Sequence, residues 1–396
     1  MTGSVDYPGS VDHPGRAEVR PRYGEASLSD IMPGVLASLG VPGASDPLGL
    51  STGALADVRV VVVLLLDGLG YQLLPLAAPH APTIADLAAG PYTRALTAGF
   101  PSTTPTSLAS LGTGAAPGAH GLVGFFLNVP GTDRVLNHIQ WTDDPDPLRW
   151  QPLATQFRRA TEAGVAAHVV FHPAFHGSGL TVSAFRGSEG HGALGVDAVA
   201  AEILSLVRAA TGPTVIYGYA GDVDTAGHAY GLRSPQWTEA LAKVDRLVRR
   251  VRSGLPPGAA LLVTADHGQI NVPAEHRFDL DADPRLRAGI RVVAGESRVR
   301  YLHTVQGATA DVVDAWRGVL ADTAWVVTRD EAIAAGWFGP VAEAHLQRIG
   351  DVVAALNEDY VVLASASDPP QVAQMIAFHG SATEPEMLIP LLVARR

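Results

Sequence analysis

The heptapeptide VVVVLLL at residues 60–66, followed directly by Asp67, is the most informative segment of this chain. Seven consecutive aliphatic residues without alternation are typical of a strand that is buried on both faces of a mainly parallel sheet. Two later segments have the same apolar character, TVIYGY at 214–219 and ALLVTA at 260–265. The three segments predict three core strands of one sheet.

Helical patterns separate these predicted strands. VDAVAAEILSLVRAA at 196–210 is one, and another begins at Ser234, which precedes a proline at the first helical position. Alternating strands and helices predict an α/β fold with a mainly parallel central sheet sandwiched by helices. Ligands of such folds bind at the carboxyl ends of the strands, which is where Asp67, Asp224 and Asp266 are expected.

The chain divides into four predicted parts. Residues 1–27 contain the tandem repeat SVDYPG and SVDHPG, whose Pro and Gly content indicates a flexible N-terminal tail. Residues 28–274 are interpreted as the catalytic α/β core and residues 371–396 as a return to it. Between them, residues 275–370 change to short strands and helices, and we expect a smaller α+β cap inserted into the core.

The composition restricts the class of partner. With 47% hydrophobic and 17% charged residues, the 396-residue chain has ample material for a large core. A net charge of −11 argues against a nucleic-acid scaffold, since binding to a phosphate backbone needs a basic surface. A small phosphorylated substrate remains compatible, because bound cations can reverse the local field.

Cysteine is absent from the sequence, which excludes disulfides, thiolate metal ligands and a cysteine nucleophile. The first residues show no basic region followed by an apolar stretch, as a secretory signal would require. The apolar run at 60–66 is far too short to span a membrane. We therefore expect a cytoplasmic protein that does not bind membranes.

Acidic and imidazole side chains near the predicted strand ends form a candidate metal site, because hard or borderline divalent cations bind carboxylate and imidazole ligands. The candidates are Asp67, Asp224, His228, Asp266, His267 and His379. Asp224 and His228 are four residues apart, so a helix would place both on one face. Taken singly, each has a simpler explanation: Asp67 could cap a helix, and His379 could be structural. Their joint placement at one sheet edge favours the metal site.

A candidate nucleophile lies in FPSTTPTSLASLGTGAAPGAHG at 100–121. Thr104 and Pro105 are interpreted as the N-cap and the first residue of a helix, where unpaired N–H groups and the helix dipole favour a phosphoryl oxygen. A nearby cation would lower the pKa of the threonine hydroxyl. Thr104 could equally well only cap its helix. Local chemistry also leaves three rival hydroxyls, those of Ser102, Thr103 and Thr106.

Five ordered motifs resemble those of the type I phosphodiesterase/nucleotide pyrophosphatase family of the alkaline phosphatase superfamily. They are LLLDGLG around Asp67, TGAAPGAHG at 113–121, DTAGHAYG at 224–231, DHG at 266–268 and HG at 379–380. In this family the nucleophilic threonine lies nine residues before the threonine that opens the second motif. The corresponding residue here is Thr104.

The resemblance implies a hydrolase that cleaves phosphodiester or pyrophosphate bonds of nucleotide-like substrates through a phosphothreonine at Thr104. Two divalent metal ions are implied, usually Zn²⁺ in this family, with Mn²⁺ possible. The implied ligands are Asp224, His228 and His379 for one ion, and Asp67, Asp266, His267 and the Thr104 oxygen for the other.

One position departs from the family pattern. The diesterases have an asparagine five residues after the signature histidine, where it contacts a phosphate oxygen. Here the residue five after His120 is Phe125, within the apolar segment GLVGFF. We therefore expect this chain to share the family's reaction class more closely than its substrate. Phe125 is kept as a candidate substrate-binding residue.

Other functions stay open. A phosphomonoesterase, a phosphonate hydrolase or a phosphomutase could use the same metal core. A serine hydrolase is a remote alternative: GLSTG at 49–53 matches G-x-S-x-G, but its surroundings are loop-like. A non-catalytic binding module is disfavoured, because all seven proposed ligand positions are filled.

Overall fold

A seven-stranded sheet forms the centre of the computed structural model, which describes residues 18–396. Its strands are β1 (Val60–Leu66), β2 (Arg94–Thr97), β5 (Ala166–Phe171), β6 (Glu189–Gly192), β7 (Thr214–Ala220), β8 (Ala259–Thr264) and β17 (Leu388–Arg395). They lie side by side in the order β2, β17, β8, β1, β7, β5, β6. The three strands expected from the apolar segments are therefore neighbours at its centre.

The sheet is mixed but mostly parallel. β1 pairs in parallel with both β7 and β8, and β5 pairs in parallel with β7 and β6. Only β17 runs antiparallel to its neighbours, β8 and β2. Every residue of β1 and of β8 is buried, as expected for strands covered on both faces. The predicted α/β class is confirmed.

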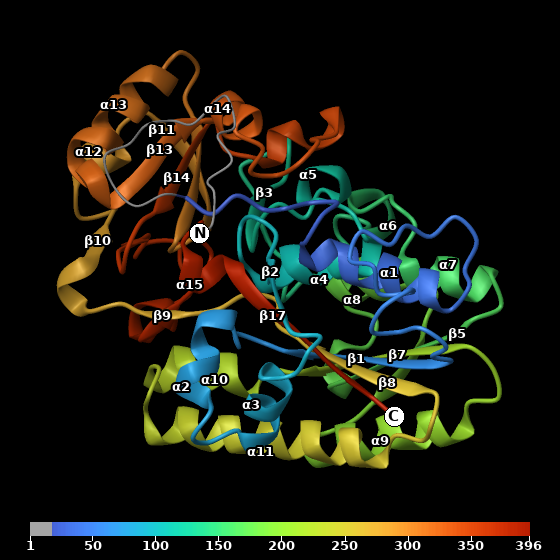
Figure 1. Cartoon of the computed structure of the whole chain (residues 1–396). Helices are drawn as coiled ribbons and strands as arrows, with labels where there is room; N and C mark the ends of the chain where they lie inside the picture. The colour runs from blue at the N-terminus through green and yellow to red at the C-terminus, as the bar shows by residue number, and fades with distance from the viewer. Residues whose placement is uncertain (1–17) are drawn as a thin grey trace, which may run out of the picture.

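Helices cover both faces of this sheet (Figure 1). One face carries α3 (Pro82–Ala88), α9 (Val196–Ala209), α10 (Asp222–Tyr230) and α11 (Pro235–Gly254). The other carries α1 (Ile31–Ser38), α4 (Thr104–Thr113), α7 (Gln156–Glu162) and α8 (Gly179–Phe185). α11 begins where expected, since the Ser234 side chain accepts a hydrogen bond from the N–H of Trp237.

A second, smaller α+β unit lies beside the central sheet (Figure 1). It consists of β10 (Arg277–Asp279), α12 (Pro284–Arg287), β11 (Ile290–Glu296), β12 (Val299–Thr304), α13 (Thr309–Leu320), β13 (Ala324–Thr328), α14 (Arg329–Ala334), β14 (Val352–Leu356) and β15 (Val361–Leu363). β11, β12, β14 and β13 form an antiparallel sheet in that order. The domain boundaries at 275 and 370 stay a prediction.

The two faces of this smaller sheet pack against different cores. Leu302 of β12 packs with Trp316 of α13 in a separate hydrophobic cluster, whereas its neighbour Tyr301 belongs to the main core. The Tyr301 hydroxyl donates a hydrogen bond to the carbonyl of Val123 at 2.6 Å. Side chains alternate between the two faces of a strand, so the same strand joins both cores. This unit is thereby held firmly against the rest of the molecule.

Two short strands lie where the smaller unit joins the central fold. β9 (Ile270–Asn271) pairs antiparallel with β16 (Ala377–Phe378), although more than a hundred residues separate them in sequence. The pairing places residue 379, which follows β16, beside residues 266–269, which precede β9. A further hairpin joins β3 (Phe126–Asn128) to β4 (Val135–Asn137). Four further short helices lie in the described chain: α2 (Leu74–Ala77), α5 (Pro117–His120), α6 (Pro147–Trp150) and α15 (Glu384–Met387).

The expected N-terminal tail divides into two parts. The tandem repeat and the rest of residues 1–17 lie outside the described residues. Residues 18–27, in contrast, contact the core: the N–H of Val19 donates to the carbonyl of Ala382 at 2.8 Å. The Tyr23 hydroxyl accepts from the N–H of Phe100 at 3.0 Å. This segment is therefore part of the fold and not of a tail. Among the helices built by residues 18–396, none has both the length and the apolar character needed to cross a bilayer.

Candidate active site

Three aspartates meet at the carboxyl edge of the central sheet. Asp67 directly follows β1, Asp224 lies in the first turn of α10 after β7, and Asp266 lies two residues after β8. Because these parallel strands are neighbours, their carboxyl ends converge. Asp67 and Asp266 are almost completely buried, with 2% and 0% of their surface exposed. The structure brings together all three aspartates expected at this edge.

Three histidines surround these carboxylates. His228 lies one helical turn after Asp224, and its Nε2 is 3.3 Å from the Asp224 carboxylate, as the spacing in α10 predicts. His267 and His379 stack with ring centroids 3.6 Å apart. The pairing of β9 with β16 produces this contact between residues far apart in sequence.

Each histidine presents the same nitrogen to the carboxylates. Nδ1 of each ring lies within hydrogen-bond distance of a backbone carbonyl oxygen, which can only accept. The pairs are His267 with Gly268 at 3.1 Å, His228 with Ala377 at 2.8 Å, and His379 with Ser102 at 3.0 Å. Nδ1 therefore carries the proton, and Nε2 keeps its lone pair toward the cluster. Metal-binding histidines are oriented in the same way.

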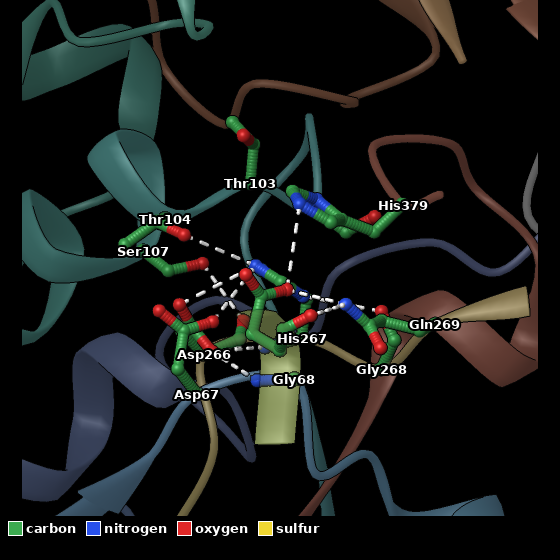
Figure 2. A network of polar contacts seen from close by, with 12 residues as sticks. Asp67, Gly68, Thr103, Thr104, Ser107, Asp266, His267, Gly268, Gln269 and His379 are labelled. Atoms are coloured by element: carbon green, nitrogen blue, oxygen red, sulfur yellow. Dashed lines mark hydrogen bonds and ion pairs between the residues drawn. The ribbon is translucent and has the colours of Figure 1, made fainter. Parts of the chain in front are cut away.

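Thr104 faces this cluster from the start of α4 (Figure 2). Its Oγ1 lies 3.2 Å from Nε2 of His267, and since that nitrogen carries no proton, the hydroxyl donates to it. The expected helix start was wrong by one residue: the N-cap is Thr103, and Thr104 is the first helical residue. The side chain of Thr103 makes no capping hydrogen bond and points elsewhere. Thr104 therefore does not cap the helix, which was the alternative role considered for it.

The candidate ligand atoms form two overlapping groups. In each group the atoms lie within 4.8 Å of one another: Asp67, Asp266 and His267 make one, and Asp224, His267 and His379 the other. His267 belongs to both groups. His228 belongs to neither, although it adjoins Asp224. The structure thus collects every expected ligand, and the division between two ions stays a prediction.

The buried carboxylates fit divalent cations. Oδ1 of Asp67 and Oδ2 of Asp266 are buried and have no hydrogen-bond partner among residues 18–396. Burial raises the pKa of Asp67 well above its ordinary value, and the charges of Asp266 and Asp224 raise it further. Unpaired buried carboxylate oxygens are costly, and a bound cation would satisfy both.

Several side chains that sequence reasoning missed hold these carboxylates in place. The Tyr219 hydroxyl donates to Oδ2 of Asp67, and the Gln269 amide donates to the Asp224 carboxylate. The N–H groups of Gly68 and His267 both donate to Oδ1 of Asp266 at 3.1 Å (Figure 2). The only signal for Tyr219 was a polar group near the end of an apolar strand.

Close packing requires a glycine at position 268. A Cβ atom at this position would lie 2.0 Å from the carbonyl oxygen of Pro385 and 3.1 Å from the Cα of Gly70. Its backbone is not in the left-handed region. Close approach of two neighbouring segments, and not backbone conformation, therefore excludes a side chain after His267.

A cavity of about 430 Å³ opens onto the cluster and has a strongly aromatic wall. Its aromatic side chains are Phe125, Phe126, Phe171, Phe175, Phe185, Tyr217, Tyr219 and Phe378. Phe125, the candidate from the sequence, is thus placed to contact a substrate. Among the residues described, no arginine or lysine lines this cavity.

Glu296 is a further cavity residue that no motif indicated. It ends β11 of the smaller unit, and its Oε2 accepts a hydrogen bond from the Thr103 hydroxyl at 3.0 Å. Burial raises the pKa of Glu296 to about 8, so the side chain is largely neutral near pH 7. Only the folded chain brings this acid into contact with Thr103, the residue before Thr104.

The raised pKa of Glu296 predicts a pH-dependent stability. The folded state holds this proton more tightly than the unfolded state, so the stabilisation is complete below pH 4.5 and is lost as the pH rises through about 8. Glu296→Gln keeps an acceptor for Thr103 and removes the titration. As the pH rises across this range, we expect the free energy of unfolding of the variant to increase relative to that of the wild type, by a few kcal/mol at most. Urea unfolding at a series of pH values measures this, and parallel curves for both proteins would contradict it.

The serine of GLSTG lies away from this site. Ser51 of GLSTG donates to Asp46 at 2.7 Å and lies in a turn, without the preceding strand that a nucleophile elbow needs. The serine-hydrolase alternative therefore has no support.

Comparison with known families decides the relationship. The family described as Type I phosphodiesterase / nucleotide pyrophosphatase matches residues 61–382. The chain belongs to this family. The match spans the five motifs and confirms the resemblance seen in the sequence, including the place of the family in the alkaline phosphatase superfamily. The protein is accordingly a hydrolase of the phosphodiesterase/pyrophosphatase family, whose substrates are small phosphate esters.

Solved structures share the fold at low sequence identity. Murine ectonucleotide pyrophosphatase/phosphodiesterase 5 is 19% identical with a TM-score of 0.67, over 85% of this chain and 88% of its own. Phosphonoacetate hydrolase from Sinorhizobium meliloti, in complex with phosphonoformate, is 19% identical with a TM-score of 0.65, over 85% and 90%. No curated protein matches the sequence significantly. The two structures differ in the chemistry that their names state, so the fold leaves the substrate open.

Proposed function

We propose that this protein is a two-metal phosphodiesterase in which Thr104 is the nucleophile. One observation carries the proposal: the Thr104 hydroxyl lies 3.2 Å from Nε2 of His267, beside two buried carboxylates with unpartnered oxygens. A hydroxyl, an imidazole and carboxylates in this arrangement suit binding of a cation that activates the hydroxyl.

The residues would hold two cations as the family resemblance implies. Asp67, Asp266, His267 and Thr104 would bind one ion, and Asp224, His228 and His379 the other. Three imidazoles among carboxylates suit Zn²⁺, although Mn²⁺ accepts such ligands as well. When bound, the ions supply Lewis-acid stabilisation of negative charge and lower the pKa of the threonine hydroxyl.

The chain's own groups act around the attack on phosphorus. The Thr104 oxygen forms a bond to phosphorus while the ester bond to the leaving oxygen breaks, which gives a phosphothreonine and an alcohol. Thr104 is the first residue of α4, so the N-terminus of this helix and its dipole would favour the negative charge of a phosphoryl group bound to Thr104. Water then cleaves the Thr104 ester, releases a phosphomonoester and restores the hydroxyl.

The cavity favours diesters over more highly charged substrates. Among the described residues its walls carry no arginine or lysine that could pair with the second negative charge of a monoester. A diester has one negative charge, whereas a monoester has nearly two at neutral pH. The aromatic wall around Phe125 suits a flat or apolar substituent such as a nucleobase. We therefore propose nucleotide-like diesters as the preferred substrate class.

The solved relatives point to two substrate classes. One structure of murine ectonucleotide pyrophosphatase/phosphodiesterase 5 is an inactive threonine-to-alanine variant in complex with AMP, which supports both a threonine nucleophile and a nucleotide-like substrate. The similarity to phosphonoacetate hydrolase supports a phosphonate hydrolase as the second candidate. A substrate with a carboxylate would however need a cationic partner, and the wall formed by residues 18–396 supplies no arginine or lysine.

A substrate panel tests the assignment. With saturating zinc, and in parallel with manganese, we expect kcat/KM for bis-p-nitrophenyl phosphate to exceed that for p-nitrophenyl phosphate by about 100-fold or more, because no cationic side chain of the described cavity wall pairs with the extra charge of the monoester, a difference of a few kcal/mol. Phosphonoacetate should be a poor substrate. Preference for the monoester or for phosphonoacetate would contradict the diesterase assignment. Phosphoryl transfer between sugar positions without release would indicate a mutase, and absence of bound metal a binding module.

A further inference from the structure

A second cluster of potential metal ligands lies at the β6 edge of the central sheet, away from the candidate active site. His168 projects from β5, and Glu189 and His191 project from β6. His168 is paired with Glu189 in register, and His191 is two residues further along the same strand, so all three side chains share one face. None of them lines the active-site cavity.

The donor atoms of this edge cluster are already close enough to share one ion. Nδ1 of His168 lies 3.1 Å from Nε2 of His191, and Oε2 of Glu189 lies 3.5 Å from Nδ1 of His168. Two nitrogens bound to one zinc ion in tetrahedral geometry are about 3.3 Å apart, given Zn–N distances of about 2.0–2.1 Å. The observed spacing therefore needs almost no rearrangement to accept a cation.

A fourth residue orients His191. Nδ1 of His191 lies 3.1 Å from the Glu202 carboxylate on α9, which accepts its proton and leaves the Nε2 lone pair facing His168. A carboxylate behind a histidine in this way fixes the ring and strengthens it as a metal ligand.

The sequence of β6 gives independent support. The strand reads EGHG, and glycine, glutamate and histidine are not residues that favour strands. As a four-residue edge strand it has a single pairing partner, β5. Its two non-glycine side chains, Glu189 and His191, both point into the cluster. A cation bound there would fasten this weak strand to β5.

We propose that His168, Glu189 and His191 form a third divalent-cation site of the zinc type, which joins β6 to β5. The fourth position is open to water, since both imidazoles are only 18% exposed but Glu189 lies at the surface with 68% of its side chain accessible. Without an ion, the same atoms would share a proton, with His168 donating to His191. The site is structural and independent of the proposed catalysis.

Zinc-edge anomalous diffraction from crystals of the full chain, grown with a small excess of zinc, locates each ion separately. We expect a peak between His168 and His191 as well as peaks at the aspartate cluster. Zinc content after gel filtration should be about three ions per chain in the wild type and about two in His191→Ala. His80→Ala, which removes an exposed imidazole elsewhere, should retain about three.

Two milder variants keep the test valid if His191→Ala fails to fold. Glu189→Gln changes an exposed ligand, and Glu202→Gln changes only the residue that orients His191. Each should weaken zinc binding at this site by about ten- to a hundredfold in competition with a chromophoric chelator, with diester hydrolysis within about twofold of the wild type. No anomalous peak at the edge cluster, or zinc affinity unchanged in both variants, would overturn the proposal, whatever is found at the aspartate cluster.

Discussion

Thr104→Ala should lower kcat for bis-p-nitrophenyl phosphate by at least about 10³-fold at saturating zinc, because the covalent route through the phosphothreonine is lost. The remaining ligands of the first ion, Asp67, Asp266 and His267, stay in place, so zinc content should change little. The measurement is steady-state hydrolysis followed by release of p-nitrophenol, with metal content determined on the same samples.

Two matched variants isolate the role of this hydroxyl. Thr106→Val lies two residues further along α4 and removes a buried hydroxyl that has no hydrogen-bond partner among the described residues, so activity should stay within about threefold. Thr104→Ser keeps an oxygen at the same place and should retain a substantial part of the rate. If Thr104→Ala hydrolyses the diester as fast as Thr106→Val, the nucleophile is another group.

The core of the fold could be predicted because its signals are local. VVVVLLL became β1 with the expected bounds, and TVIYGY and ALLVTA became β7 and β8 to within one residue at each end. The serine cap before α11 behaved as expected. The antiparallel β17 was not foreseen, because strand direction depends on how distant segments return to the sheet.

The candidate site was predictable only in part. Asp67 and Asp266 follow strands that the pattern identifies, but His379 reaches them through a pairing of two-residue strands that no local pattern reveals. Family spacing, and not chemistry, distinguished Thr104 from the neighbouring hydroxyls. Glu296 was missed because the smaller unit folds over the site, and no motif marks a residue whose importance comes from burial alone.

Asp67→Asn should abolish most diesterase activity. The variant should also be more stable than the wild type without zinc and less stable with zinc. In the metal-free protein, burial beside Asp266 and Asp224 raises the pKa of Asp67, so the folded state binds its proton more tightly than the unfolded state. The corresponding stabilisation is present below pH 3.8 and is lost as the pH rises through the raised pKa. At mildly alkaline pH the wild type therefore carries uncompensated repulsion, which the neutral amide removes.

The expected order of melting temperatures follows from this repulsion. With a chelator, Asp67→Asn should be more stable than the wild type by about 1–3 kcal/mol, since it no longer buries an unpaired charge and the Tyr219 hydroxyl can still donate to its side-chain oxygen. With excess zinc, the wild type gains binding free energy, about 4 kcal/mol at a thousand times Kd, and the variant gains less because a ligand is missing. With zinc, the wild type is therefore expected to be the more stable protein.

Asp222→Asn is the matched control. Asp222 is a half-buried aspartate in the same helix as Asp224 but in neither ligand group, so this variant should have the same melting temperature as the wild type under both conditions. If Asp67→Asn is the less stable protein both with and without zinc, the carboxylates do not repel one another in the metal-free protein. The physical argument for a two-metal site would then be wrong.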